Sequence, residues 1–167
     1  MTQLTPTPII LDCDPGHDDA VAILLAVSSP SIDLLAVTTC FGNCSIEDAT
    51  RNALRILTLA GATDVPVGRG AGDPLVAPLE LGNYVHGKSG LDGPDMPEPA
   101  FKESEQSAVE LMHSMISAHS EPVTMVVTGP MTNMAQLLRT HPGDAGNIAE
   151  VIFMGGSTER GNHTPSA

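Results

Sequence analysis

The sequence contains no tryptophan, one tyrosine and three phenylalanines, so any core must be built mainly from aliphatic side chains. Hydrophobic residues still make up 41% of the chain, which is too large a share for a disordered protein. Its 167 residues suit one domain and can bury about two-thirds of their unfolded surface. We therefore expect a single domain over residues 1–167.

Basic residues are scarce, with 7 Lys and Arg against 20 Asp and Glu and a formal net charge of −13. Nucleic acids and anionic membranes both bind basic surfaces, so we expect neither as a partner. No secretory signal or long apolar run is visible, which predicts a cytoplasmic location. The acidic excess allows a cation site, because clustered carboxylates hold hard metal ions.

Cysteine is also sparse, with three residues at positions 13, 40 and 44. An odd, small count predicts no disulfide framework. Cys40 and Cys44 could form half of a zinc site, but no Cys/His pair follows at zinc spacing. We therefore expect core thiols.

Short apolar runs alternate with segments of helical period along the chain. The expected strands cover residues 8–13, 32–39, 65–68, 122–127 and 149–154, and the expected helices cover residues 17–27, 45–60, 107–119 and 131–139. Residues 69–102 are rich in Gly and Pro and show no period, which is typical of a functional or disordered loop. The alternation predicts an α/β fold with an open, mostly parallel sheet and helices on both faces.

Polar, glycine-bearing turns follow four of the expected strands. They begin at Asp12, Phe41, Thr128 and Gly155. Ligands of open α/β sheets bind outside the carboxyl ends of the strands. One or two such turns are unremarkable in any protein, but four on one sheet edge favour a binding site.

The first of these turns holds four carboxylates within eight residues: Asp12, Asp14, Asp18 and Asp19. Close like charges repel, so the cluster needs a cation or raised pKa values. Favourable placement at a helix N-terminus explains Asp18 and Asp19 but not Asp12 and Asp14. An EF-hand is excluded, because Ile23 stands at the twelfth position where that loop needs Glu. A cation site of another kind is favoured.

Ordered motifs extend this pattern over essentially the whole chain. They are residues 12–20 (DCDPGHDDA), 38–43 (TTCFGN), 85–90 (VHGKSG), 128–133 (TGPMTN), 154–156 (MGG) and 161–165 (GNHTP). Together they resemble the inosine–uridine nucleoside hydrolases. The resemblance implies a Rossmann-like fold and calcium-dependent hydrolysis of the N-glycosidic bond of a small-molecule ribonucleoside. The segments 86–94 and 122–133 look most like the pyrimidine-preferring branch.

The resemblance also implies a metal site. Asp14 and Asp19 would bind Ca²⁺ through their carboxylates and Thr128 through its backbone carbonyl. Asp14 would also act as general base on the attacking water. Calcium takes oxygen ligands and leaves room for water and sugar hydroxyls, so this set is chemically coherent. Asp12 would orient its neighbours.

Substrate contacts implied by the resemblance involve Asp18, Asn43, His86, Met154 and Asn162. Asp18 and Asn43 would hold ribose hydroxyls, and His86 would lie near the base. Met154 and Asn162 would contact the ribose. Taken singly, Asn43 reads as a turn residue, His86 as a loop residue and Met154 as core.

No catalytic role is expected for the other histidines, at positions 17, 113, 119, 141 and 163.

Two departures from the family pattern stand out. Lys88 occupies a position that is often acidic in the family. The chain also ends at Ala167, where the family would continue with a ribose-binding Glu-Phe-Asn segment, a calcium-binding Asp and a His that protonates the leaving base. We therefore expect an apparently truncated fold, a site about half present, and self-association as a homo-oligomer.

Two other functions compete with the hydrolase. Asp12 and Asp14 mimic the Asp-x-Asp motif of haloacid-dehalogenase-like phosphatases, but the later paired acids of those enzymes are missing. The chain could instead be a catalytically inactive fragment that binds calcium or nucleoside, or that only oligomerises.

Overall fold

Five parallel strands form one open sheet in the computed structural model, which describes residues 5–159 and residue 161. They are β1 (Thr7–Cys13), β2 (Ile32–Thr39), β3 (Val67–Arg69), β4 (Val123–Val127) and β5 (Ile148–Phe153). Their spatial order is β3-β2-β1-β4-β5, and every neighbouring pair is parallel. The strand order reverses direction at β1 and β4, which is where ligands bind in Rossmann-like sheets.

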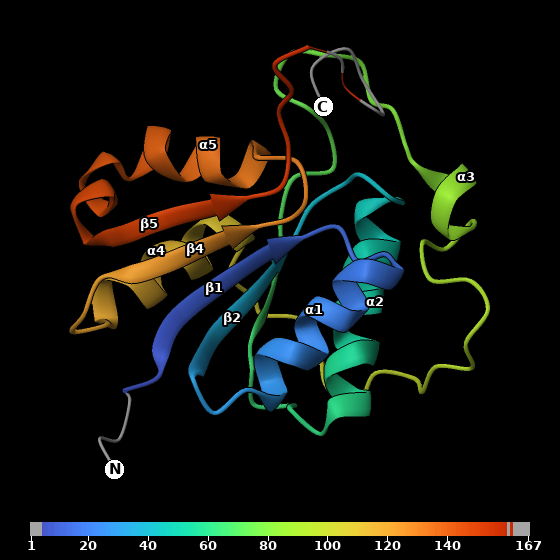
Figure 1. Ribbon diagram of the computed structural model, residues 1–167, viewed down its shortest axis with the longest axis horizontal. Coiled ribbons are helices and arrows are strands. Elements are labelled where there is room, and N and C mark those ends of the chain that lie inside the picture. The colour runs from blue at the N-terminus through green and yellow to red at the C-terminus, as the bar shows by residue number, and fades with distance from the viewer. Residues whose placement is uncertain (1–4, 160, 162–167) are drawn as a thin grey trace.

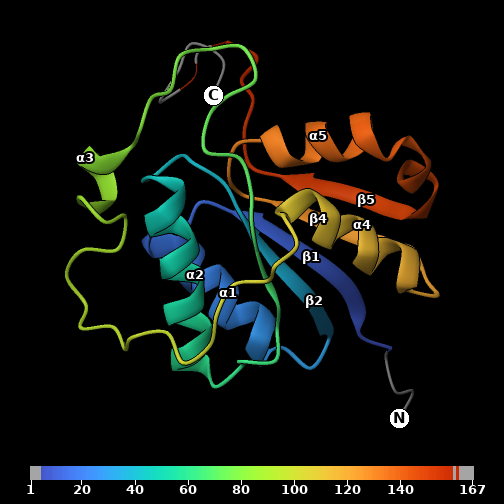
Figure 2. The ribbon, with the colours of Figure 1, turned by 180° about the vertical axis from the view of Figure 1, so that it is seen from behind.

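Helices cover both faces of the sheet (Figures 1 and 2). They are α1 (His17–Ser28) and α2 (Ile46–Ala60) on one face, and α4 (Ala108–Ala118) and α5 (Thr132–Thr140) on the other. The predicted open parallel sheet with helices on both faces is confirmed. No helix of the described residues is long and apolar enough to cross a membrane.

The central strand β1 is buried on both faces, which explains its nearly continuous apolar sequence. Leu11 and Cys13 belong to the apolar cluster that includes α1 and α2, whereas Ile10 belongs to the cluster that includes α4 and α5. No aromatic residue is among the buried members of either cluster. Cys13, Cys40 and Cys44 are free and buried, as predicted.

Local signals determine where α2 begins and ends. The Ser45 hydroxyl accepts a hydrogen bond from the Asp48 amide at 3.2 Å, which caps the first turn. Gly61 ends the helix with a φ of 70°, a left-handed conformation that glycine adopts without steric cost. Both ends of this helix agree with the boundaries expected from the sequence.

The structure contains two short elements that the sequence pattern does not predict. The loop over residues 69–102 contains one helical turn, α3 (Asn83–His86), and a 3₁₀ turn, η1 (Pro142–Asn147), precedes β5. Neither is long enough to show a hydrophobic period. β3 also begins later than predicted, after Pro66, whose nitrogen has no hydrogen to donate to a sheet.

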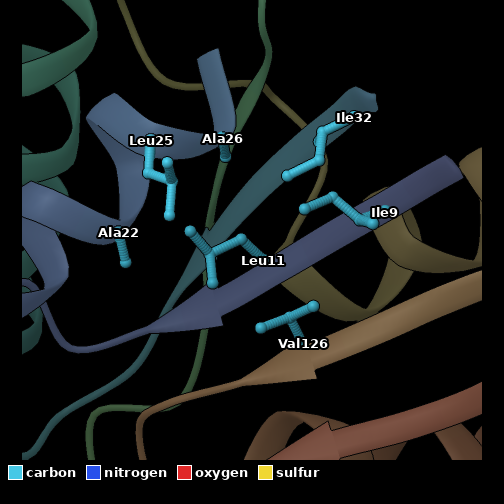
Figure 3. Close-up of a pocket in the computed structure, with 7 residues that line it drawn as sticks. All are labelled: Ile9, Leu11, Ala22, Leu25, Ala26, Ile32 and Val126. Atoms are coloured by element: carbon cyan, nitrogen blue, oxygen red, sulfur yellow. The ribbon is translucent and has the colours of Figure 1, made fainter. Parts of the chain in front are cut away.

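An apolar pocket lies between α1 and the strands β1, β2 and β4 (Figure 3). Its lining residues are Ile9, Leu11, Ala22, Leu25, Ala26, Ile32 and Val126. They include no charged or polar side chain, so the pocket offers nothing to a metal ion or a sugar.

Two leucines of α2 give a matched test of the core. Leu57 is fully buried, whereas Leu59 is 57% exposed on the same helix. We expect Leu57→Ala to lower the free energy of unfolding by about 2–5 kcal/mol, because the change removes buried contacts and leaves a cavity. Leu59→Ala should cost less than about 0.5 kcal/mol. Urea denaturation of both variants checks this, and equal losses would contradict the assigned packing of α2.

Candidate functional site

The loops that follow β1, β2 and β4 meet at the carboxyl edge of the sheet. The Cys40 amide donates to the Cys13 carbonyl at 3.1 Å, and the Thr128 amide donates to the Asp12 carbonyl at 2.9 Å. A side chain at Gly129 would stand 2.9 Å from Asp14 Oδ1. Two of the other three predicted turns therefore converge on the acidic segment after β1.

Asp14 is held in place from the loop after β2. Its Oδ2 accepts a 2.7 Å hydrogen bond from the Asn43 amide, and Asn43 Nδ2 donates to the Asp14 carbonyl at 2.9 Å. Gly42 lies directly against the Asp14 carboxylate, with a φ of 154° and no room for a side chain. Asp14 is 7% exposed, and this burial, reinforced by the charge of Asp19, raises the pKa of Asp14 to about 8.

Asp19 approaches from the first turn of α1. Its Oδ1 accepts a 2.7 Å hydrogen bond from the Thr128 hydroxyl, and its Oδ2 accepts a longer one, 3.4 Å, from the Gly16 amide. Burial raises the pKa of Asp19. Asp14, Asp19 and Thr128, which were predicted to share a metal ion, are therefore neighbours at one point of the sheet edge.

Asp12 lies beneath this pair and is fully buried. Its Oδ1 accepts hydrogen bonds from the Thr38 hydroxyl at 2.7 Å and from Asn133 Nδ2 at 2.8 Å. Its Oδ2 has no hydrogen-bond partner among the described residues. Burial raises the pKa of Asp12 to about 7. The orienting role expected for Asp12 stays a prediction.

Asn133 is the last residue of a sequence motif, and its side chain hydrogen-bonds to three separate segments at the sheet edge. Besides Asp12, its Nδ2 contacts the Thr39 carbonyl at 2.9 Å, and its Oδ1 accepts from the Ala71 amide at 2.8 Å. One buried amide thus joins β1, β2 and the loop after β3. No local pattern predicts these contacts, because the partners of Asn133 lie 62 to 121 positions away.

His86 reaches the edge on the loop that carries α3. A side chain at Gly16 would stand 2.9 Å from its Cδ2 and 2.8 Å from Asn43 Nδ2. His86 Nε2 lies 3.6 Å from Asp18 Oδ1, and the Asp18 side chain is 66% exposed. The structure thus places His86, Asn43 and Asp18 beside the buried acids.

The last two predicted substrate contacts are Met154 and Asn162. Met154 follows β5, and its amide donates to the Val127 carbonyl at 2.9 Å. Met154 is 65% exposed, so it is not a core residue. Asn162 lies outside the described residues. Lys88, the departure from the family pattern, is exposed in the loop beside His86.

The oxygen donors at this site are of the type that a hard cation prefers, but they are too few to fill its coordination shell. Asp14 and Asp19 are buried carboxylates whose pKa values are raised by burial, and the charge of Asp19 adds to the rise at Asp14. A cation would relieve this cost of ionisation. Ca²⁺ takes about six to eight oxygen ligands, more than these two side chains and the Thr128 carbonyl provide. In residues 5–159 and 161, no three His, Cys, Asp or Glu side chains form a metal-binding group.

Known proteins are similar to this chain in sequence and in fold. Residues 9–167 match the family model for inosine-uridine preferring nucleoside hydrolase. The chain is 54% identical over 160 residues to the pyrimidine-specific ribonucleoside hydrolase RihA of Photobacterium profundum, covering 96% of this chain and 52% of that protein. RihA of Escherichia coli O139:H28 is 52% identical over the same share of this chain and 51% of its own length.

The fold of this chain is also similar to that of a solved structure. The purine-preferring ribonucleoside hydrolase from Gardnerella vaginalis superposes with a TM-score of 0.88 and 32% identity, over 95% of this chain and 52% of that one. The chain therefore spans about half the length of the curated relatives it matches.

The raised carboxyl pKa values predict an unusual dependence of stability on pH. Between the usual value of 3.8 and about 8, folded Asp14 keeps a proton that the unfolded chain has lost. Stability should therefore be greatest at low pH within this window and fall as pH rises through 8. With chelator present, we expect the free energy of unfolding to fall by about 1 kcal/mol or more between pH 5 and pH 8.

Denaturant titrations of two variants check this dependence. Asp14→Asn should reduce the fall, whereas Asp33→Asn, which changes an exposed acid on β2, should not. Adding calcium at pH 8 should restore stability to the wild type more than to Asp14→Asn. Stability that rises from pH 5 to pH 8 would contradict the raised pKa values.

Proposed function

The chain belongs to the inosine-uridine preferring nucleoside hydrolase family, and we propose that it supplies part of a site that hydrolyses the N-glycosidic bond of ribonucleosides. The observation that carries this proposal is the buried pair Asp14 and Asp19 beside Thr128 and Asn43, at the strand ends where the sheet order reverses. The motif that suggested a phosphatase belongs to this family instead.

Asp14, Asp19 and the Thr128 carbonyl would hold a calcium ion. When bound, the ion supplies Lewis-acid chemistry that makes a water molecule easier to deprotonate. Asp14 would then act as the general base, because its carboxylate would lie next to that water molecule. The Asn43 amide fixes the orientation of that carboxylate through the 2.7 Å hydrogen bond to Oδ2.

The ribose would lie across the outer side of this edge. Asp18 has an exposed carboxylate that can accept hydrogen bonds from sugar hydroxyls, and the Asn43 side chain lies against Gly16, where the ring of His86 also lies. Holding these hydroxyls fixes C1′ for attack as oxocarbenium character develops. His86 would lie near the base, with Met154 and Asn162 contacting the ribose from the segment after β5.

We propose a preference for pyrimidine nucleosides. The relatives described as pyrimidine-specific are 54% and 52% identical to this chain, whereas the purine-preferring structure is 32% identical. The higher identities support uridine and cytidine as substrates.

Hydrolysis is tested in a chimera in which residues 9–167 replace the matching half of the Photobacterium relative. We expect it to release free base from uridine without phosphate, to stop in EDTA and to recover with calcium. Asp14→Ala should lower kcat by about 10²–10⁴-fold or more, because it removes the general base. Asp64→Ala, which changes an exposed acid after α2, should leave the rate unchanged. A requirement for phosphate would identify a phosphorylase and overturn the proposal.

We also propose that the 167-residue chain self-associates through an exposed apolar strip. β5 pairs only with β4 among the described strands, and Ile152 stands opposite Val126 in their register. Val126 lines the apolar pocket (Figure 3). Ile152, its partner in the register, is 51% exposed. Leu25 of α1 borders the same pocket and is 64% exposed. An edge strand with exposed apolar side chains is prone to pair with another chain.

Light scattering of the purified chain tests this association. We expect oligomers in the wild type and a shift towards monomer in Ile152→Lys, because a charge on the strip must be desolvated on association. Leu59→Lys puts the same charge on an exposed position of α2 and should change nothing. A monomeric wild type would rule the strip out as an interface.

A further inference from the structure

We propose that His17 is a positioning residue that fixes the ring of His86 by binding the loop of residues 86–92 to the start of α1. Its meaning for catalysis rests on the proposed function, in which His86 lies at the base end of the site. The sequence pattern indicates no role for His17, because its partners are 69 and 75 positions away.

The first contact joins the two imidazole rings. His17 Nδ1 lies 3.0 Å from His86 Nδ1, with the ring centroids 5.3 Å apart and the ring planes inclined by 44°. Two nitrogen lone pairs would repel at this distance, so one hydrogen must lie between them. Nδ1 of His86 is therefore occupied, and its Nε2 is the nitrogen that faces Asp18.

The second contact joins His17 to the far end of the same loop. His17 Nε2 lies 2.9 Å from the carbonyl oxygen of Asp92. A carbonyl oxygen can only accept, so this ring nitrogen carries a hydrogen. One side chain of α1 thus holds both ends of the segment from His86 to Asp92.

The loop between these ends is rigid in its own right. The Asp92 carboxylate accepts hydrogen bonds from the amides of Lys88, at 2.8 Å, and Ser89, at 3.1 Å, and from the Ser89 hydroxyl. The Asp92 amide donates to the His86 carbonyl at 3.2 Å. A restraint on the Asp92 carbonyl therefore passes to the whole turn and to the backbone of His86.

Other residues already hold the middle of the loop to the protein. Asn52 of α2 is buried, and its Nδ2 donates to the Ser89 carbonyl at 2.8 Å and to the Pro15 carbonyl at 3.1 Å. Leu91 is 6% exposed within the core cluster of α1 and α2. Loss of the His17 side chain should therefore leave the loop attached and remove the shortest contact of the His86 ring, whose Nδ1 also lies 3.4 Å from the His17 amide. A change at the ring with the loop still attached distinguishes a positioning role from a purely structural one.

Nuclear magnetic resonance on the 167-residue chain tests the inference without any need for activity. In His17→Ala we expect the ¹⁵N resonance of His86 Nδ1 to move and hydrogen exchange of the Asp92 amide to rise about tenfold. Exchange at Leu91 should not change. His119→Ala is the control, because the His119 ring lies far from this loop in the sequence and its Nδ1 contacts the local backbone at Glu121.

Two conservative variants separate the contacts. With the hydrogen of the neutral His17 ring on Nε2, Nδ1 accepts, and an asparagine side-chain oxygen can take its place as acceptor. His17→Asn should therefore restore the His86 resonance. A glutamine amide nitrogen takes the place of Nε2, so His17→Gln should restore protection at Asp92. An unchanged His86 resonance in His17→Ala would overturn the proposal.

The chimera then tests the consequence for catalysis. His17→Ala should raise KM for uridine more than it lowers kcat, because a misplaced His86 weakens binding near the base, and His17→Asn should recover part of the loss. A KM equal to that of the unsubstituted chimera would overturn the positioning role. A chimera without any hydrolysis would sink the proposed function, and the resonance of His86 would still decide the role of His17.

Discussion

The burial of like-charged carboxylates at one sheet edge is the constraint on which the site depends. Asp14 and Asp19 are 7% and 3% exposed, so neither is screened by bulk water. Hydrogen bonds from other loops partly stabilise each buried carboxylate. The Asn43 amide donates to Asp14, and the Thr128 hydroxyl donates to Asp19. The cost that remains appears as raised pKa values, and it is a cost that a bound cation would remove.

The parallel sheet makes this arrangement possible. All five described strands run in one direction, so the loops at their carboxyl ends share one edge. Glycines allow the close approach: Gly42 lies against the Asp14 carboxylate, and Gly129 stands beside it from the other strand. Asn133 connects β1, β2 and the loop after β3 through three hydrogen bonds. The acids therefore lie at the end of a hydrogen-bonded strand, whereas His86 lies on a loop that is held to the helices by separate contacts.

Much of the fold could be predicted because its signals are local. The buried strand of residues 8–13, the cap at Ser45 and the glycine that ends α2 each depend on neighbours in sequence. The one-turn helix α3 could not be predicted, because four residues carry no period. The site was predicted through its motifs, and the structure brings Asp14, Asp19, Thr128, Asn43 and His86 together. The roles that the family pattern implies for these five residues stay predictions, which the variants above test.

The sequence by itself determined the fold class, the aliphatic core and the acidic segment that begins the site, because composition, period and capping are properties of adjacent residues. Only the tertiary structure decided which long-range partners hold the site. Asn133 and Asn52 are ordinary helix residues in the sequence, and His17 reads as a residue at the start of a helix. Their contacts to β1, β2 and the loop of residues 86–92 exist because the sheet brings distant strand ends within hydrogen-bond reach, a distance that no spacing along the chain records.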